Sequence, residues 1–171
     1  MDNKFEIVRL DGETPPAQVA QFVGMMQRMY EFHATLHADW QPKPNWQQGS
    51  QNWIKHAGSN EDYFFAMAYP LNPTGYIDQE AAPAGYIIAH FHYEAPLFVQ
   101  NRFGYIADLW VEAAYRQQGV ARRILAAANS WFKAQDISRV QIEVDVENAA
   151  GQKFWHGIGY QDFEVVMRTD I

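Results

Sequence analysis

The chain has 171 residues, 48% of them hydrophobic and 15% aromatic, which is enough to bury one core and too short to suggest two. We therefore expect a single domain over residues 1–171. The formal net charge of -7 argues against binding to nucleic acid or to an anionic membrane surface and suits a cationic partner better. The absence of cysteine excludes disulfides, thiolate metal sites and a cysteine nucleophile.

No part of the chain predicts a membrane or export segment. The first ten residues lack an apolar signal region behind a basic start, and no apolar run reaches the roughly 18 residues that a membrane-spanning helix needs. The sequence therefore predicts a protein without a membrane partner, placed in the cytoplasm.

The first half of the chain predicts one strand, two helices and two further strands. Residues 4–10 alternate apolar and polar side chains, as a strand with one buried face does. Helical spacing predicts a helix over 15–38 that begins with two prolines, and a second helix that ends near residue 56. Aromatic and β-branched runs predict strands over 63–69 and 84–95, joined by a long polar connection.

The second half predicts alternating strands and helices. A strand over 102–111 is followed by a helix over 120–135 and by a strand over 138–146, whose valines and isoleucine share one face. A short helix over 148–157 and a closing strand or strands within 160–171 complete the chain. This order of elements predicts a mixed α/β domain.

The stretch "RQQGVA", residues 116–121, lies where the strand over 102–111 gives way to a helix. The first N–H groups of a helix have no intrahelical acceptor and carry partial positive charge, so such a turn can bind an anion. Gly119 and Ala121 are small enough to let a phosphate approach the backbone, and Arg116 adds a cation. The same pattern also fits an ordinary turn, and it lacks the Lys and hydroxyl residues of nucleotide-binding loops.

Further residues follow this turn at set spacing: Asn148, Gly151, Phe154 with Trp155, and Gly159 with Tyr160. With Arg116, Gly119 and Ala121 they resemble the motifs of the GNAT superfamily of N-acetyltransferases, over roughly residues 103–163. The resemblance implies a GNAT-like single α/β domain. Its sheet is mixed and mostly antiparallel, flanked by helices, with strands four and five parallel and splayed.

The resemblance also implies acetyl-CoA as co-substrate and no metal. The pyrophosphate is expected on the main-chain N–H groups of Gln117, Gln118, Gly119, Val120, Ala121 and Arg122, with Arg116 beside them. The pantetheine arm is expected to pair like an added strand with Leu109, Trp110 and Val111. Asn148 aligns with an asparagine near the pantetheine, although it also suits the N-cap of the helix that follows.

Acetyl transfer to an amine needs a group that takes a proton, because a primary amine with a pKa of about 10.4 is almost entirely charged at neutral pH. Asp108 is the first candidate because it interrupts an apolar strand just before the segment expected to pair with the cofactor. Its alternative role is a buried acid held by an Arg or Tyr. Glu143 and Asp145 share one face of the next strand, as second candidates for the base or for amine recognition, or as a solvated face. The N–H of Leu109 or Val111 is the expected donor to the oxyanion.

Trp155 departs from the family pattern, in which many members place a tyrosine there as general acid. Indole cannot supply that proton. Tyr160, His156 or water are the alternatives, unless the thiolate leaves unassisted.

Two pairs of histidines could each place two imidazoles on one face: His33 with His37, and His90 with His92. Neither pair has an evident third ligand, so we predict no metal site. The first pair, together with Trp40 and Trp46, is expected either to form an aromatic wall of the acceptor site or to pack as ordinary core.

The sequence thus predicts an N-acetyltransferase that acts on a small primary amine: a polyamine, an amino-acid derivative or an aminoglycoside-like compound. The alternatives are acetylation of a protein N-terminus or lysine, and a non-catalytic acyl-CoA-binding module, which the missing tyrosine favours. A homodimer is possible.

Overall fold

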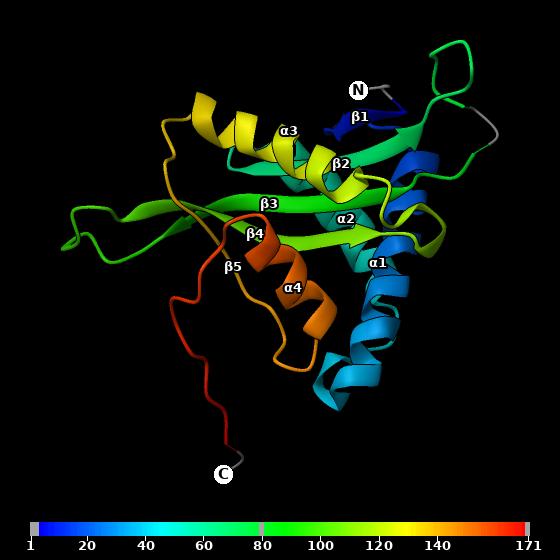
Figure 1. Cartoon of the computed structure of the whole chain (residues 1–171). Helices are drawn as coiled ribbons and strands as arrows, with labels where there is room; N and C mark the ends of the chain where they lie inside the picture. The colour runs from blue at the N-terminus through cyan, green and yellow to red at the C-terminus, as the bar shows by residue number, and fades with distance from the viewer. Residues whose placement is uncertain (1–3, 79–80, 170–171) are drawn as a thin grey trace.

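A five-stranded mixed sheet forms the centre of the computed structural model, which describes residues 4–78 and 81–169 (Figure 1). Its strands are β1 (Phe5–Leu10), β2 (Tyr63–Pro70), β3 (Gly85–Tyr93), β4 (Arg102–Val111) and β5 (Val140–Ile142), in that spatial order. The first four pair antiparallel, and β5 runs parallel to β4. The predicted fold, with its parallel fourth and fifth strands, is confirmed.

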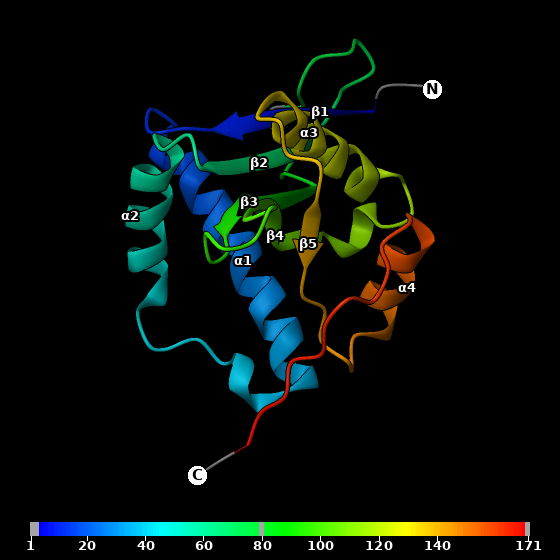
Figure 2. The same cartoon turned by 90° about the vertical axis from the view of Figure 1, so that its left-hand side faces the viewer.

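Helices cover both faces of this sheet. In the described residues they are α1 (Pro16–Leu36), α2 (Trp46–Gly58), α3 (Val120–Ala134) and α4 (Ala149–Gly157), with short 3-10 turns η1 (Ala38–Trp40) and η2 (Ala113–Tyr115). The helices α1 and α2 lie on one face, and α3 and α4 on the other (Figure 2). Within residues 4–78 and 81–169, no helix combines the length and the apolar character needed to cross a bilayer.

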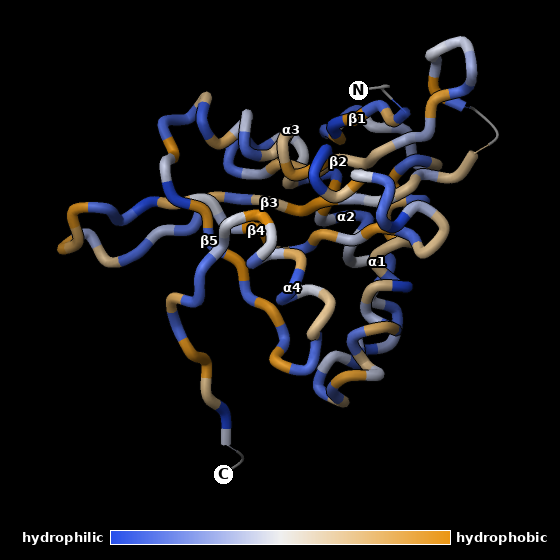
Figure 3. Tube along the Cα trace, in the orientation of Figure 1, coloured by the Kyte–Doolittle hydropathy of each residue, from blue (hydrophilic) through white to orange (hydrophobic). Residues whose placement is uncertain are grey.

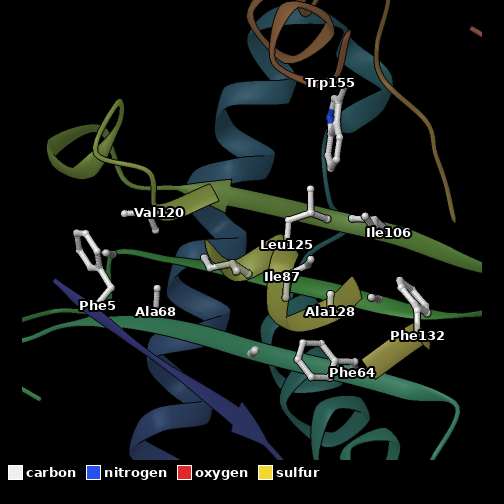
Figure 4. Packing of buried hydrophobic residues seen from close by; sticks show 14 of the residues in the cluster. Phe5, Phe64, Ala68, Ile87, Ile106, Val120, Leu125, Ala128, Phe132 and Trp155 are labelled. Carbon is white, nitrogen blue, oxygen red and sulfur yellow. The ribbon is translucent and has the colours of Figure 1, made fainter. Parts of the chain in front are cut away.

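Each face of the sheet buries its own hydrophobic cluster. On the α3 face, Ile87 and Ile106 of the sheet meet Leu125 and Phe132 of α3 and Trp155 of α4 (Figure 4). The α1 face holds a second cluster, which includes Phe22, Met25, Phe65, Tyr86 and Ile88. Full burial of each such side chain stabilises the fold by about 1.5–3 kcal/mol. The sheet is therefore held from both sides.

The strand predicted over 138–146 is shorter in the structure, where β5 ends at Ile142. Its pairing with β4 stops at Ile106↔Ile142, because β4 continues alongside β3 and diverges from the chain that follows β5. Residues 143–146 therefore form no backbone hydrogen-bond ladder with β4. Val144 still packs against the α3-face cluster, whereas Val146 is 83% exposed.

The closing strand predicted within 160–171 is wrong for residues 160–169, which form no strand, and residues 170–171 lie outside the described residues. After α4 the backbone turns at Gly159, with φ +100°, and the Tyr160 N–H bonds the Trp155 carbonyl. The chain then runs away from the sheet and reaches η1, where Arg168 bonds Asp39 (Figure 2). A strand forms only beside a partner, and this segment pairs with none in the described chain. The other predicted helices and strands are confirmed, with ends shifted by a few residues.

Candidate functional site

The sheet opens between β4 and β5. The two strands pair only from Gly104↔Val140 to Ile106↔Ile142, so beyond Ile106 the strand β4 has β3 on one side and, within the described chain, no neighbour on the other. Such an edge offers main-chain donors and acceptors to an extended ligand. Leu109, Trp110 and Val111, the residues expected to pair with pantetheine, lie on this open stretch.

The turn between β4 and α3 presents main-chain donors. Gln117 has φ +61° and Gly119 has φ +83°, and α3 begins at Val120, where the sequence predicted it. The N–H groups of residues 118, 119, 121 and 122 have no hydrogen-bond acceptor among the residues that the structure describes. A Cβ on Gly119 would meet no atom within 4 Å, so glycine is needed there for its backbone conformation and leaves the turn open. The geometry suits an anion.

Arg116 is held between the turn and the open edge of β4. Its Nε donates to the Val111 carbonyl at 3.1 Å, and its guanidinium carbon lies 4.9 Å from the centre of the Trp110 ring. The Gln118 side chain donates to the Ala114 carbonyl at 2.8 Å, which steadies the loop from the other side. A positive charge is thereby fixed where the turn meets β4.

A β-bulge in β4 decides which way Asp108 points. Ala89 pairs with Ile106 and Ile88 pairs with Asp108, so Ala107 is the extra residue. Ile106 lies in the α3-face cluster, and in a regular strand Asp108 would face the same way. The bulge turns Asp108 to the α1 face, where the Tyr86 hydroxyl donates to its Oδ2 at 3.3 Å.

The environment of Asp108 favours its neutral form. Burial raises the pKa of the Asp108 carboxyl from 3.8 to about 6, against a smaller lowering effect from the Tyr86 hydrogen bond. Burial and the negative charge of Asp108 raise the pKa of the Tyr30 and Tyr86 hydroxyls, so both stay protonated. No Arg, Lys or His in the described chain forms an ion pair with Asp108. The acid is hydrogen-bonded to Tyr86 and titrates near pH 6.

Glu143 lies on the same side of the sheet as Asp108. It forms a hydrogen bond with the Tyr105 hydroxyl, whose pKa is raised by burial and by the charges of Glu143 and Asp108. Asp145, two residues on, accepts from Trp40 Nε1 at 2.8 Å. The Glu147 N–H and this indole lower the pKa of Asp145. The structure thus places all three predicted carboxylates around the splay between β4 and β5.

Aromatic side chains from the end of α1 face these carboxylates. The His33 ring lies 5.5 Å from Trp40 and the Phe32 ring 5.8 Å from Trp110, between ring centres. Burial lowers the pKa of His33, an effect that the charge of Asp145 only partly opposes. Its Nδ1 is buried without a partner. His33 and Trp40 therefore lie next to Asp145, a position that suits the aromatic wall of the acceptor site expected from the sequence.

The other histidines have different surroundings. His90 and His92 lie 5.2 and 5.9 Å from Tyr105 between ring centres, and His37 faces Asp39. In residues 4–78 and 81–169, no group of three or more His, Asp or Glu side chains could hold a metal ion.

The residues of α4 lie on the opposite face from Asp108. Asn148 caps α4, with Oδ1 accepting from the Gly151 N–H at 2.9 Å. Trp155 is only 9% exposed within the α3-face cluster, and the Tyr160 ring packs 4.9 Å from it. Burial raises the pKa of Tyr160 to about 12, so its hydroxyl stays protonated at neutral pH. His156 faces Asp162 at 2.8 Å.

Sequence patterns did not indicate the tyrosines near the acids: Tyr30, Tyr86 and Tyr105. They come from α1, β3 and β4, and no motif marks them. The available signal was a hydroxyl-bearing side chain at a buried position in the strand next to Asp108, because a buried hydroxyl needs a partner.

The α/β sheet opens between its parallel fourth and fifth strands, with a helix start that has free N–H groups beside the opening, as expected for an acyl-CoA-dependent transferase. The model of the acetyltransferase (GNAT) family matches residues 26–160. The chain belongs to this family of acetyltransferases.

The chain is similar in sequence to one relative, and several solved structures share its fold. N-alpha-acetyltransferase 30 of Saccharomyces cerevisiae is 32% identical over 57 residues, which spans 33% of this chain and only 32% of that protein. A tetramutant of the BH1408 protein from Bacillus halodurans superposes with a TM-score of 0.77 at 18% identity, over 97% of this chain and 99% of that one. The aminoglycoside N-acetyltransferase AAC(6')-Iy in complex with CoA gives 0.74 at 14% identity, over 100% and 97%. The aminoglycoside acetyltransferase meta-AAC0020, from an uncultured soil sample and in complex with sisomicin, gives 0.71 at 15% identity, over 99% and 97%.

Proposed function

We propose that this chain transfers the acetyl group of acetyl-CoA to a primary amine of a small cationic molecule: a polyamine, an amino-acid derivative or an aminoglycoside-like compound. The observation that carries this proposal is the position of Asp108. A carboxyl with a pKa of about 6 stands directly before the open edge of β4, on the same side as Glu143. One solved neighbour of this fold, the aminoglycoside acetyltransferase meta-AAC0020, is in complex with the aminoglycoside sisomicin.

The donor side fits acetyl-CoA, which would supply the acetyl thioester. The free N–H groups of Gln118, Gly119 and Ala121 would hold the pyrophosphate, and Arg116 would add its charge. Arg116 bonds the Val111 carbonyl, which shows that this carbonyl points away from β3. Every second residue of a strand directs its main-chain groups to the same side, so the N–H and C=O of Leu109 also point to the open edge. There Leu109 would pair with pantetheine amides and with the thioester oxygen. Asn148 remains a proposed neighbour of the pantetheine, in addition to its capping role.

On the acceptor side, Asp108 would take the proton from the attacking amine. Its pKa of about 6 leaves the carboxyl largely ionised at neutral pH and still close enough to neutrality to act as a base. Tyr86 fixes its orientation. Glu143 and Asp145 would attract the positive charge of the substrate, while Tyr160 is the proposed proton donor to the leaving sulfur.

One contact favours a small acceptor over a long peptide. Trp40 Nε1 bonds Asp145 at 2.8 Å and so links η1, beyond the end of α1, to the chain after β5. The second candidate is acetylation of a protein N-terminus, which the similarity to N-alpha-acetyltransferase 30 favours. A cytoplasmic location and the single domain stay predictions.

The test is acetyl-CoA turnover with a panel of polyamines, amino-acid amides, aminoglycosides and short peptides with free N-termini. Thiol release can be followed directly, because the chain has no cysteine to react with the reagent. We expect amine-dependent release with small multivalent cations, and acetylated product by mass. Turnover with peptides alone would support the second candidate. No turnover with any amine, together with CoA binding by calorimetry, would overturn both and leave a binding module.

A further inference from the structure

An open pocket of about 320 Å³ lies at the base of the sheet, where β4 and β5 begin. The chain that enters β4 from the β3–β4 hairpin forms one wall, and the connection from α3 to β5 forms the other (Figure 1). Figure 3 shows that the residues entering β4 are hydrophilic, whereas the hairpin tip is hydrophobic. Most of the lining is polar and includes Gln100, Asn101, Arg102, Asp136, Ser138 and Arg139.

This pocket is separate from the proposed acetyl-CoA site. The strand β4 runs from Arg102 at the pocket to Val111 next to the donor turn, and a strand of ten residues spans about 30 Å. The splay between β4 and β5 also opens toward the far end, beyond Ile106. A ligand in this pocket would therefore contact neither the turn nor the acceptor side chains.

Two arginines line the pocket without a carboxylate partner. The chain has 20 Asp and Glu against 13 Lys and Arg, yet neither Arg102 nor Arg139 forms an ion pair in the described chain. Arg139 instead donates to Gln100 Oε1 at 2.6 Å. The Arg102 guanidinium carbon lies 3.9 Å from the centre of the Phe91 ring, and its Nε is buried without a hydrogen-bond partner. A buried donor normally has an acceptor, so an anion is the group that this pocket lacks.

The connection from α3 to β5 adds further donors and one opposing charge. The main-chain N–H groups of Ser138 and Arg139 have no acceptor among the described residues, and the Ser138 hydroxyl forms no hydrogen bond there either. Asp136 is the only acid in the lining, and it pairs with neither arginine in the described chain. Two guanidinium groups against one carboxylate leave the pocket with a positive charge.

We propose that this pocket binds a small phosphate monoester, with the phosphate between Arg102 and Arg139. Two guanidinium groups match the charge and the several oxygens of a phosphate, whereas a single carboxylate would need only one of them. The Ser138 hydroxyl and the free N–H groups would bond the remaining oxygens. The volume exceeds that of a bare phosphate, and Val99 and Ile137 line the part that would hold the organic group.

The bound ligand should also stabilise the fold. The strands β4 and β5 pair through only three residue pairs, from Gly104↔Val140 to Ile106↔Ile142. A phosphate held by Arg102 and Arg139 would tie the starts of both strands together. Because a ligand that binds only the folded chain raises its stability, the melting temperature should rise with ligand concentration.

The test is calorimetry of the full chain with glycerol 3-phosphate at constant ionic strength, with glycerol as the uncharged control. We expect one site for glycerol 3-phosphate and none for glycerol. Arg102→Gln and Arg139→Gln should each raise the Kd about 10- to 100-fold, the usual effect of losing a hydrogen bond to a charged group. Asp136→Asn should lower the Kd about two- to fivefold, because it removes the opposing charge. Asparagine also tolerates the φ of +58° at this position.

Arg9→Gln is the matched control for the two arginine variants. The Arg9 guanidinium also lies over an aromatic ring, 5.4 Å from the centre of Phe64, but on β1 at the other edge of the sheet. It should leave the Kd unchanged. Circular dichroism shows whether each variant is folded, and Arg139, which is exposed, is the substitution least able to disturb the core.

Three results would overturn the proposal. The first is no binding of glycerol 3-phosphate to the unmodified chain, and the second is an equal Kd for the unmodified chain and both folded arginine variants. The third is binding that Gly119→Val abolishes while Arg139→Gln does not, which would place the phosphate at the donor turn. Inorganic phosphate should bind more weakly than glycerol 3-phosphate, and equal affinity would overturn the assignment to a monoester. None of these readouts depends on acetyl transfer.

Discussion

The two halves of the candidate site are built in different ways. The donor half, the open edge of β4 and the turn before α3, is one continuous stretch of main chain over residues 107–122. The acceptor half gathers side chains from α1, β3, β4 and the chain after β5. Main-chain donors depend on a few backbone conformations, whereas the acceptor half depends on tertiary packing. Substitutions should therefore separate the two: some change CoA binding alone and others change turnover alone.

The largest effect is expected for Asp108→Asn, which removes the proposed base and keeps the shape of the side chain. We expect kcat/KM at neutral pH to fall by about 10²- to 10⁴-fold, the usual contribution of general-base catalysis. The affinity for CoA, measured by calorimetry, should not change. The acid limb of the pH profile, expected near the Asp108 pKa of about 6, should disappear.

Glu61→Gln is the matched control, because it neutralises an exposed carboxylate in the turn before β2 and should leave the profile unchanged. An unchanged kcat/KM for Asp108→Asn would rule this acid out as an essential base.

The next effect concerns the donor half. Gly119→Val forces a β-branched residue into φ +83° and moves the turn, so the Kd for CoA should rise about 10- to 100-fold, in step with the loss of one or two main-chain contacts to phosphate. Gly75→Val tests the same strain elsewhere, because Gly75 has φ +85° and the space where a Cβ would lie is equally open. Both variants should lose about 1–2 kcal/mol of stability. If Gly75→Val weakens CoA binding as much as Gly119→Val does, the effect on binding is not local to the turn.

Asp108→Asn also tests whether burial of Asp108 destabilises its charged form. Since the pKa of Asp108 is raised in the fold, the fold prefers the protonated acid, and stability is lost as pH rises from 3.8 through about 6. The Asp108→Asn variant has no carboxyl to ionise, so its stability does not fall over this pH range. At neutral pH this variant should be about 1–3 kcal/mol more stable than the unmodified chain. The gain is smaller than the raised pKa of Asp108 alone would give, because the residue keeps some exposed surface.

Denaturant unfolding at neutral pH and below about pH 4 measures this difference, which should vanish at the acidic end. A variant that is less stable at neutral pH would mean that the fold stabilises the carboxylate, contrary to its raised pKa.

The contrast between the halves also explains what the sequence could predict. The donor half was predictable because its signals are local: an apolar strand, a Gly with its small neighbour, and a helix that starts at Val120. The direction of Asp108 was not predictable. A regular ladder continued from Tyr93↔Arg102 would pair Asp108 with Ile87 on the α3 face, and the bulge at Ala107 reverses this. No residue type at Ala107 signals a bulge.

Residues 161–168, after α4, show the opposite case. Their β-branched and aromatic side chains favour a strand locally, but the predicted strand does not form, because a strand also needs a neighbour, which sequence patterns do not identify. The tyrosines around Asp108 were missed for the same reason, since Tyr30 and Tyr86 come from distant parts of the chain.

The smallest effect is expected at Glu143, where the acceptor half meets solvent. Glu143→Gln removes a charge that would attract the substrate but leaves Asp108 and its tyrosines in place, so KM for the amine should rise about two- to fivefold with kcat nearly unchanged. Glu147→Gln is the matched control, because it is an exposed carboxylate on the same segment with no side-chain contact to Tyr105. Raised salt should narrow the difference between Glu143→Gln and the unmodified chain, since screening weakens exposed charges. A fall in kcat with an unchanged KM would instead place Glu143 in the chemical step, as the alternative base. The base would then lie after β5, and not on β4.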